Sequence, residues 1–283
     1  FGGVMTATQL FWFAQSQADI VIAGRVLDPH DLGVYTTGLF LAQLLAAKFV
    51  PPINEVAYAA YSRQQAEGEA DMIAPALIAT IRLVILVALP AYAGLAVVAP
   101  VLVPVLLGEK WVEIAPLLPI LAGAMAMLTL QILFSPATNA RGFPGIALRV
   151  TIVGSAVMPI AFFTGSWWGL TGFAWGWVGG MTVLTGATIL LSRPVIGFSL
   201  AGLARAILPP LAAALAMAAG VALVLRGLAG APDLAALAIA VPVGVALYLG
   251  LLHRIAPDRL AEALRFIRNR GEAGSAAVPA PAE

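Results

Sequence analysis

Eight long apolar stretches limit what this chain can fold into. Each is close to the roughly 20 residues that an α-helix needs to cross the hydrocarbon core of a bilayer. They are continuous apolar runs rather than ten-residue segments of alternating hydropathy, which argues against a transmembrane β-barrel. The sequence therefore predicts an all-α polytopic membrane protein. Its eight predicted transmembrane helices are 3–24, 34–57, 75–98, 114–135, 145–164, 168–191, 203–225 and 233–252.

The composition supports the same fold class. Hydrophobic residues make up 61% of the chain and charged residues 10%, whereas soluble domains contain roughly 45–50% apolar and about 25% charged residues. The net charge of +1 gives no reason to expect nucleic-acid binding. The absence of cysteine excludes disulfides, thiolate metal sites and cysteine nucleophiles. The two histidines, His30 and His253, are far apart, so no histidine metal site is predicted.

Prolines and glycines modify the expected helices. Pro100 and Pro104 predict that the third helix ends near residue 98 and that 101–107 form a short interfacial piece. The Pro51–Pro52 pair predicts a kink in the second helix. Glycines recur every fourth residue in the sixth helix and form a ridge that allows another helix to approach closely; they are Gly172, Gly176 and Gly180.

Basic residues predict the orientation in the membrane. Numbering the loops alternately places eleven Arg residues on one side and three basic residues, Arg25, Lys110 and Arg226, on the other. The positive-inside rule makes the first side cytoplasmic, with both ends of the chain there. The eleven are Arg63, Arg82, Arg141, Arg149, Arg193, Arg205, Arg254, Arg259, Arg265, Arg268 and Arg270.

The chain ends suggest two further expectations. It begins at Phe1 inside an apolar run, without an initiator Met or a signal-peptide pattern, so we expect that an N-terminal part is missing. After Pro257 comes an amphipathic basic stretch, Arg259–Arg270. The residues that follow, Gly271–Glu283, are rich in Ala, Pro and Gly and are predicted to be a disordered tail.

The first predicted helix is polar at membrane depth, where polar and charged side chains usually face a cavity or a partner. Thr8, Trp12, Gln15 and Asp19 fall within an arc of about 60° at 100° per residue. We therefore expect this helix not to be fully exposed to lipid.

The second predicted helix carries Lys48, Asn54 and Glu55. Lys48 and Glu55 are seven residues apart and share a face, unless the prolines between them change the phase. Two interpretations stay open: the charged residues pair inside the bundle, or they line a hydrophilic translocation cavity. The candidate cavity residues are Gln15, Asp19, Lys48, Asn54 and Glu55.

No catalytic pattern occurs in the sequence. There is no Gly-rich phosphate loop followed by Lys and Ser or Thr, no G-x-S-x-G elbow and no H-E-x-x-H pair. No predicted loop exceeds about 20 residues, which leaves no room for a catalytic domain between helices. We therefore expect a transporter and not an enzyme.

Several motifs resemble those of a known family. The segment Gln17–Leu44 places an Asp-containing helix before a Leu32–Gly33–Val34–Tyr35 turn. Pro51–Arg63 closes on Ser62–Arg63, and Leu102–Ala122 contains Gly108–Glu109–Lys110–Trp111. Together with Asn139–Arg149, these segments resemble the oligosaccharide and polysaccharide flippases (Wzx-type) of the MOP, MATE-like superfamily.

The resemblance implies a transporter of two six-helix lobes around a central cavity. Residues 1–192 would be the second lobe, helices 7–12, followed by two additional helices in 193–254 and a cytoplasmic stretch and tail in 255–283. The first two helices of each lobe would help to line the cavity. The missing N-terminal lobe of the same protein would be its first partner.

The resemblance also implies a substrate. It would be a polyprenyl-diphosphate-linked oligosaccharide, moved to the periplasmic face of the bacterial inner membrane for lipopolysaccharide O-antigen, capsule or exopolysaccharide synthesis. Membrane lipids and the polysaccharide polymerase or ligase machinery would be its other partners. Coupling to a proton or sodium gradient is expected, with no other cofactor. The alternatives are a MATE-like small-molecule exporter, a membrane-bound polymerase or ligase, and a scaffold.

Overall fold

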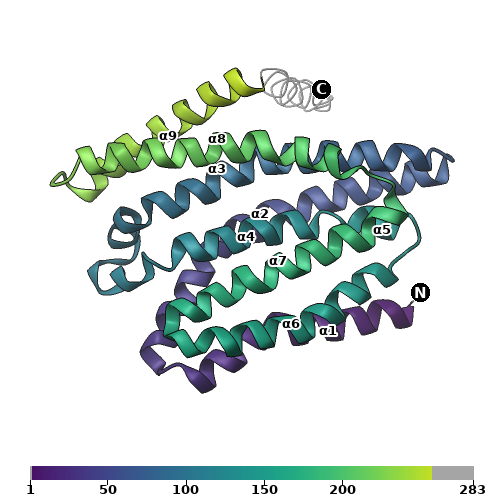
Figure 1. Ribbon diagram of the computed structural model, residues 1–283, viewed down its shortest axis with the longest axis horizontal. Helices are drawn as coiled ribbons and strands as arrows, with labels where there is room; N and C mark the ends of the chain where they lie inside the picture. The colour runs from purple at the N-terminus through teal and green to yellow at the C-terminus, as the bar shows by residue number, and fades with distance from the viewer. Residues whose placement is uncertain (1, 257–283) are drawn as a thin grey trace, which may run out of the picture.

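The computed structural model describes residues 2–256, with residues 2, 4, 5 and 8 described by their backbone alone. The predicted basic stretch Arg259–Arg270 and the tail lie outside the described residues. Within them, the chain forms nine α-helices (Figure 1). These are α1 (Gly2–Val26), α2 (Pro29–Ala66), α3 (Ile73–Leu107), α4 (Leu118–Ile132), α5 (Ser135–Ala140), α6 (Gly145–Gly165), α7 (Gly169–Ile196), α8 (Leu200–Gly227) and α9 (Asp233–Ile255).

The predicted all-α polytopic fold is confirmed, and each predicted span falls on one long helix, except that the fourth covers α4 and its flanks. Six helical stretches of the described chain are long and apolar enough to cross a membrane, among them the α6–α7 hairpin taken as one stretch. α1 is not among these six, because its glutamines and Asp19 lower its hydropathy. At 38 residues, α2 is about 57 Å long and extends beyond a ~30 Å hydrocarbon core.

Local signals explain where these helices begin and end. Asp28 caps α2, because its side chain accepts hydrogen bonds from the backbone N–H groups of His30 and Asp31. Ser199 caps α8 in the same way through the N–H of Gly202. α7 ends at Gly197, whose positive φ of 85° reverses the chain at low steric cost.

The predicted end of the third helix is wrong. α3 continues through Pro100 and Pro104 to Leu107, so 101–107 is helical and forms no separate piece. Each proline removes one backbone hydrogen bond, but packing in a membrane bundle tolerates that loss. The helix ends instead at Gly108, which has a φ of 88° and whose N–H donates to the Pro104 carbonyl. α2 likewise runs through Pro51–Pro52 as one helix.

The helices lie side by side along the long axis of the molecule (Figure 1). The connections α1–α2, α3–α4, α6–α7 and α8–α9 lie at one end, called here the α1–α2 end; the others lie at the opposite, α2–α3 end. α1 packs on α6, α6 on α7, and α7 on α4, whereas α8 and α9 pack on α3. A hydrogen bond of 2.7 Å from the Tyr248 hydroxyl to the Leu86 carbonyl joins α9 to α3.

The predicted glycine ridge packs one helix against its neighbour. A Cβ added to Gly176 would lie 2.8 Å from the Ala161 carbonyl oxygen of α6. A Cβ on Gly172 or Gly180 would lie even closer to α6, at the Gly165 carbonyl oxygen and at the Met158 sulfur. The glycines therefore allow α6 and α7 to lie close together, as expected of small residues at a membrane helix interface.

Candidate functional site

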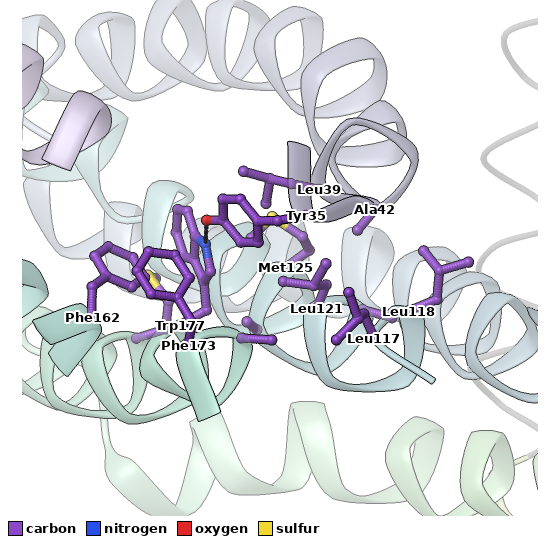
Figure 2. Close-up of a cluster of buried hydrophobic side chains, with 14 of the residues drawn as sticks. Tyr35, Leu39, Ala42, Leu117, Leu118, Leu121, Met125, Phe162, Phe173 and Trp177 are labelled. Atoms are coloured by element: carbon purple, nitrogen blue, oxygen red, sulfur yellow. Dashed lines mark hydrogen bonds between the residues drawn. The ribbon is translucent and has the colours of Figure 1, made fainter. Parts of the chain in front are cut away.

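Among the described residues, the most unusual polar group is a buried carboxylate. Asp19 lies on α1 and is 2% exposed. The Tyr35 hydroxyl on α2 donates to Asp19 Oδ2 at 2.8 Å. The indole N–H of Trp177 on α7 donates to the Tyr35 hydroxyl oxygen at 2.6 Å, as Figure 2 shows. Three helices are thus joined through one chain of side-chain hydrogen bonds.

Aromatic packing holds Tyr35, the middle residue of this hydrogen-bonded row, in place. The Tyr35 ring is fully buried and meets Phe173 edge-on, with ring centroids 5.0 Å apart. Phe173 stacks on Phe162 at 5.1 Å, and Phe162 meets the Trp177 ring edge-on at 5.4 Å (Figure 2). Edge-to-face and offset pairs of this kind are the favoured arrangements of aromatic rings. The Tyr35 hydroxyl therefore has little freedom to leave Asp19.

The second oxygen of Asp19 lacks a partner. Within the described part of the chain, no hydrogen-bond donor reaches the buried Oδ1, and no basic side chain forms an ion pair with Asp19. A buried acceptor without a donor costs roughly 1–3 kcal/mol, and a buried unpaired charge costs more. The arrangement therefore favours any species that supplies a proton or a positive charge at Oδ1.

Gln15 lies one turn before Asp19 on the same face of α1. Its Oε1 is also buried and has no hydrogen-bond partner among the described residues. The Gln15 carboxamide lies over Gly154 of α6, where an added Cβ would overlap it. Gly154 thus makes the space that lets α1 lie close to α6 with a glutamine between them.

Lys48 and Glu55 have different surroundings. Both are exposed on α2, and they lie on the same face as exposed Phe40. Lys48 is 13 residues beyond Tyr35, about 20 Å along the helix. No ion pair joins Asp19, Lys48 and Glu55 in residues 2–256, so the interpretation that these charges pair with one another has no support there.

Asn54 points away from Lys48 and Glu55. Its side-chain N–H donates to the carbonyl of Ile132, the last residue of α4, at 3.1 Å. This bond ties α2, just after Pro51–Pro52, to the corner between α4 and α5. Of the five candidate residues, the structure therefore brings Gln15 and Asp19 together, leaves Lys48 and Glu55 on one exposed face, and separates Asn54 from them.

Sequence reasoning did not assign a role to Tyr35 or Trp177. Tyr35 was visible as the last residue of the Leu-Gly-x-Tyr motif, so its motif marked it, although its contact with Asp19 could not be read from spacing. Trp177 is 142 residues further along and lies in an apolar helix without a polar pattern. Only the packing of α7 against α2 reveals it.

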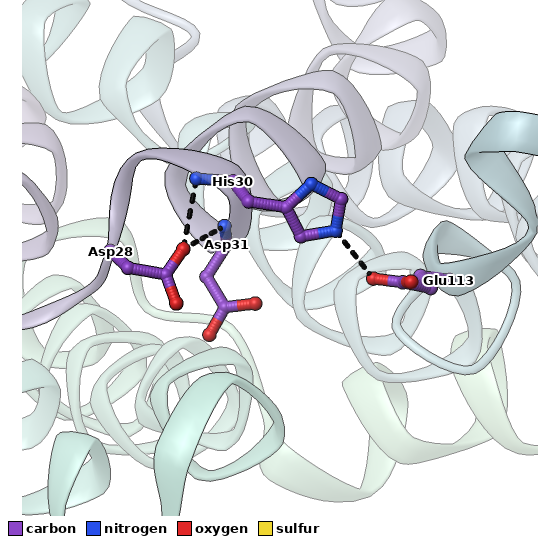
Figure 3. Close-up of polar contacts among 4 residues, drawn as sticks. All are labelled: Asp28, His30, Asp31 and Glu113. Atoms are coloured by element: carbon purple, nitrogen blue, oxygen red, sulfur yellow. Dashed lines mark hydrogen bonds and ion pairs between the residues drawn. The ribbon is translucent and has the colours of Figure 1, made fainter.

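A second polar contact lies at the α1–α2 end. His30 Nε2 is 2.8 Å from Glu113 Oε2, and both side chains are exposed (Figure 3). The pair joins the first turn of α2 to the 3-10 segment Glu109–Ile114. Among the residues described, no three His, Asp or Glu side chains gather to hold a metal ion.

A groove of about 450 Å³ lies between α6 and α7 near the same end. Its walls include Trp168, Trp175 and Gly179, and no charged residue lines it. The hydroxyl of Thr164, which also lines it, donates to the Ile160 carbonyl of its own helix. The groove is therefore apolar, unsuited to a charged head group.

Comparison with known proteins points to polysaccharide synthesis. Residues 1–116 match the family described as "Polysaccharide biosynthesis protein". The chain is 25% identical over 122 residues to the teichuronic acid biosynthesis protein TuaB of Bacillus subtilis (strain 168), an alignment covering 43% of this chain and 25% of that protein. It is 27% identical over 205 residues to an uncharacterized membrane protein in the cps region of Klebsiella pneumoniae, covering 70% of this chain and 41% of that protein.

The aligned parts thus span a quarter and about two-fifths of these relatives. No solved structure matches the chain. The predicted resemblance to polysaccharide flippase-type proteins is confirmed by the family match and by both relatives. The matched residues 1–116 contain all five candidate cavity residues and Tyr35, whereas Trp177 lies outside them.

Proposed function

We propose that this chain is part of a flippase that moves a polyprenyl-diphosphate-linked oligosaccharide from the cytoplasmic to the periplasmic face of the inner membrane. The observation that carries the proposal is the position of the family match. Residues 1–116 match a polysaccharide biosynthesis family and contain both helices with polar side chains at membrane depth, α1 and α2.

The chemical problem for such a transporter is the head group. A diphosphate and its sugars must cross a hydrocarbon layer that disfavours charge, while the lipid tail can stay in the bilayer. An exposed ammonium on α2 offers charge-assisted hydrogen bonds to phosphate or to an acidic sugar. Lys48 has this position, and Glu55 lies two turns further along the same face.

α1 and α2, which carry the polar residues, each have a face that no other part of the described chain covers. α1 rests on α6, touches α2 only slightly, and exposes Leu10, Phe11, Trp12 and Phe13. We assign residues 1–192 to one lobe of the transporter, with a second, N-terminal lobe of the same protein opposite α1 and α2. Alternating access would move one lobe against the other around the site between them.

The remaining helices belong to the periphery in this proposal. α8 and α9, which correspond to the two additional helices predicted in 193–254, pack on α3, away from α1 and α6. Seven of the eleven Arg residues lie in the described part of the chain, against three basic residues on the other side, and this bias supports a cytoplasmic location for the α2–α3 end. The short connections between helices support a transporter over a membrane enzyme.

The proposal is tested by deleting the full-length gene in its host. Lipid-linked oligosaccharide is then quantified on each face of the inner membrane, by labelling sugars that are accessible from the periplasm. We expect it to accumulate on the cytoplasmic face and to return to the periplasmic face when the intact gene is restored. An unchanged distribution in a strain without a second flippase gene contradicts the proposal and favours small-molecule export.

A further inference from the structure

Two buried oxygen atoms on neighbouring turns of α1 both lack a hydrogen-bond donor. Asp19 Oδ1 and Gln15 Oε1 are both buried, and no donor in the described chain reaches either of them. Residues four apart on a helix are neighbours, with Cβ atoms about 6 Å apart. Two acceptors cannot satisfy each other unless a hydrogen lies between them.

We propose that Asp19 is a proton-binding site, held in its uncharged carboxylic acid form with the proton on Oδ1 and Gln15 Oε1 as the acceptor. One proton then satisfies both oxygens. Asp19 Oδ2 continues to accept the hydrogen bond of the Tyr35 hydroxyl, whose oxygen accepts from Trp177. Both Asp19 oxygens, Gln15 Oε1, the Tyr35 hydroxyl and the Trp177 indole N–H would then each have a partner.

The surroundings favour a proton over a sodium ion. Sodium in membrane transporters is usually held in part by backbone carbonyls of unwound helices. α1 is continuous from Gly2 to Val26, so the carbonyls around Asp19 are engaged in the helix. A sodium ion would therefore depend on side-chain ligands, namely the two unpaired oxygens and the Tyr35 oxygen. The Tyr35 hydroxyl already donates one hydrogen bond and accepts another.

Within residues 2–256, no basic side chain pairs with Asp19 to keep it ionised. The titratable group in contact with it is Tyr35 of α2. The charged residues of α6 and α7, Arg149 and Arg193, lie near the α2–α3 end of these helices. On α1 itself, Arg25 is six residues further along, about 9 Å, and is exposed.

This site gives the transporter a way to respond to a proton gradient, an extension that rests on the proposed function. Loss of the proton would leave a buried anion with Tyr35 as its side-chain donor and no cation paired with it in the described chain, an unfavourable state in an apolar core. α1 would then favour a position in which Asp19 meets water. α1 is held mainly by α6, because it has few contacts with α2 and several side chains of its first half are exposed.

The proton site is tested by infrared difference spectroscopy on the purified full-length protein in sodium-free vesicles. We expect a carbonyl stretching band of a protonated carboxyl at neutral pH, where an exposed aspartate, with an ordinary pKa of about 3.9, is ionised. Asp19→Asn should remove that band without unfolding the protein, because the amide has the shape of the neutral acid. If the wild-type and Asp19→Asn spectra are identical in this region, the proposal is wrong.

The role of Gln15 is tested by comparing a substitution there with the same substitution at Gln9. Gln15→Met keeps the size of the side chain but removes the acceptor, so the band should disappear at lower pH than in the wild type. Gln9→Met, at an exposed glutamine on the same helix, should leave the titration unchanged. Equal effects of the two variants would overturn the assignment of Gln15. Loss of the band when sodium is added would instead identify Asp19 as a sodium site.

The extension to transport has its own readout. Flipping of the lipid-linked sugar by the wild type should change when a pH gradient is imposed on the vesicles, and flipping by Asp19→Asn should not. If both proteins flip and respond equally to the gradient, coupling through Asp19 is overturned while the flippase function stands. If neither the wild type nor the variant flips the lipid, the proposed function fails, and the infrared band still decides the proton site.

Discussion

Trp177 and Tyr35 lie 142 residues apart in the chain, yet their side chains are joined by a hydrogen bond of 2.6 Å in the core. The bond holds the Tyr35 hydroxyl against Asp19 and links α7 to α2. Because the two residues come from helices that pack weakly on each other, this bond and the aromatic cluster around it carry much of the contact between them.

Trp177→Phe should therefore destabilise the protein. The ring is largely kept, but the Tyr35 oxygen loses its donor in a buried site, which costs roughly 1–3 kcal/mol. The measurement is thermal unfolding of the purified protein in detergent. Trp175→Phe is the control, because Trp175 is 56% exposed and is not a member of the buried aromatic cluster. Equal melting temperatures of the two variants would contradict a role for the indole N–H.

The two glycines Gly176 and Gly179 should respond differently to alanine. At Gly176 the new Cβ would lie 2.8 Å from the Ala161 carbonyl oxygen, so α6 and α7 must separate, at a cost of about 1–3 kcal/mol. At Gly179 no atom lies within 4 Å, and alanine favours the helix by up to about 1 kcal/mol. Unfolding midpoints measured side by side should fall for Gly176→Ala only. A similar fall for both would argue against the close packing of α6 on α7.

The positive charge of Lys48 should be required for transport. If its ammonium binds a phosphate or an acidic sugar, Lys48→Ala removes a charge-assisted contact of about 1.5–3 kcal/mol, so flipping should slow by roughly tenfold or more. Lys48→Arg should retain most of the activity. Lys110→Ala, at an exposed lysine in the α3–α4 connection, serves as the control in the same deletion strain. Full complementation by Lys48→Ala would remove Lys48 from the site.

The His30–Glu113 pair should make stability depend on pH. His30 lies in the first turn of α2, before the predicted transmembrane stretch 34–57, so we expect it outside the hydrocarbon core. Its hydrogen bond to Glu113, and then the charge of that carboxylate, raise the pKa of His30 above the ordinary 6.5. A pKa that is higher in the folded state adds stability that is fully present below the unfolded value and is lost as pH rises through the folded value.

The test compares wild type with His30→Gln. The wild type should melt at a higher temperature than the variant in acidic buffer, and the difference should vanish in alkaline buffer. Glu113→Gln should show the same pattern. The contribution is small because both side chains are solvated, and high salt should reduce it further. A difference in melting temperature that does not change with pH would exclude an ionic pair.

Sequence alone determined the class of the fold, because crossing a bilayer is a local requirement of length and hydropathy that each stretch meets by itself. It also marked α1 as polar and identified Gln15 and Asp19 as members of one face, since helical phase follows directly from spacing. The ridge at Gly176 was predictable for the same reason. The end of the third helix was not, because whether Pro100 breaks a helix depends on what packs around it.

Only the tertiary structure decided which polar residues meet. Lys48, Asn54 and Asp19 were equivalent as polar residues at depth, but the fold exposes the first, ties the second to Ile132 and buries the third under Tyr35. The donor that completes this group, Trp177, comes from a helix with no polar pattern. Contacts between helices depend on side-chain packing across residues far apart in the chain, and that information is absent from the periodicity of any single helix.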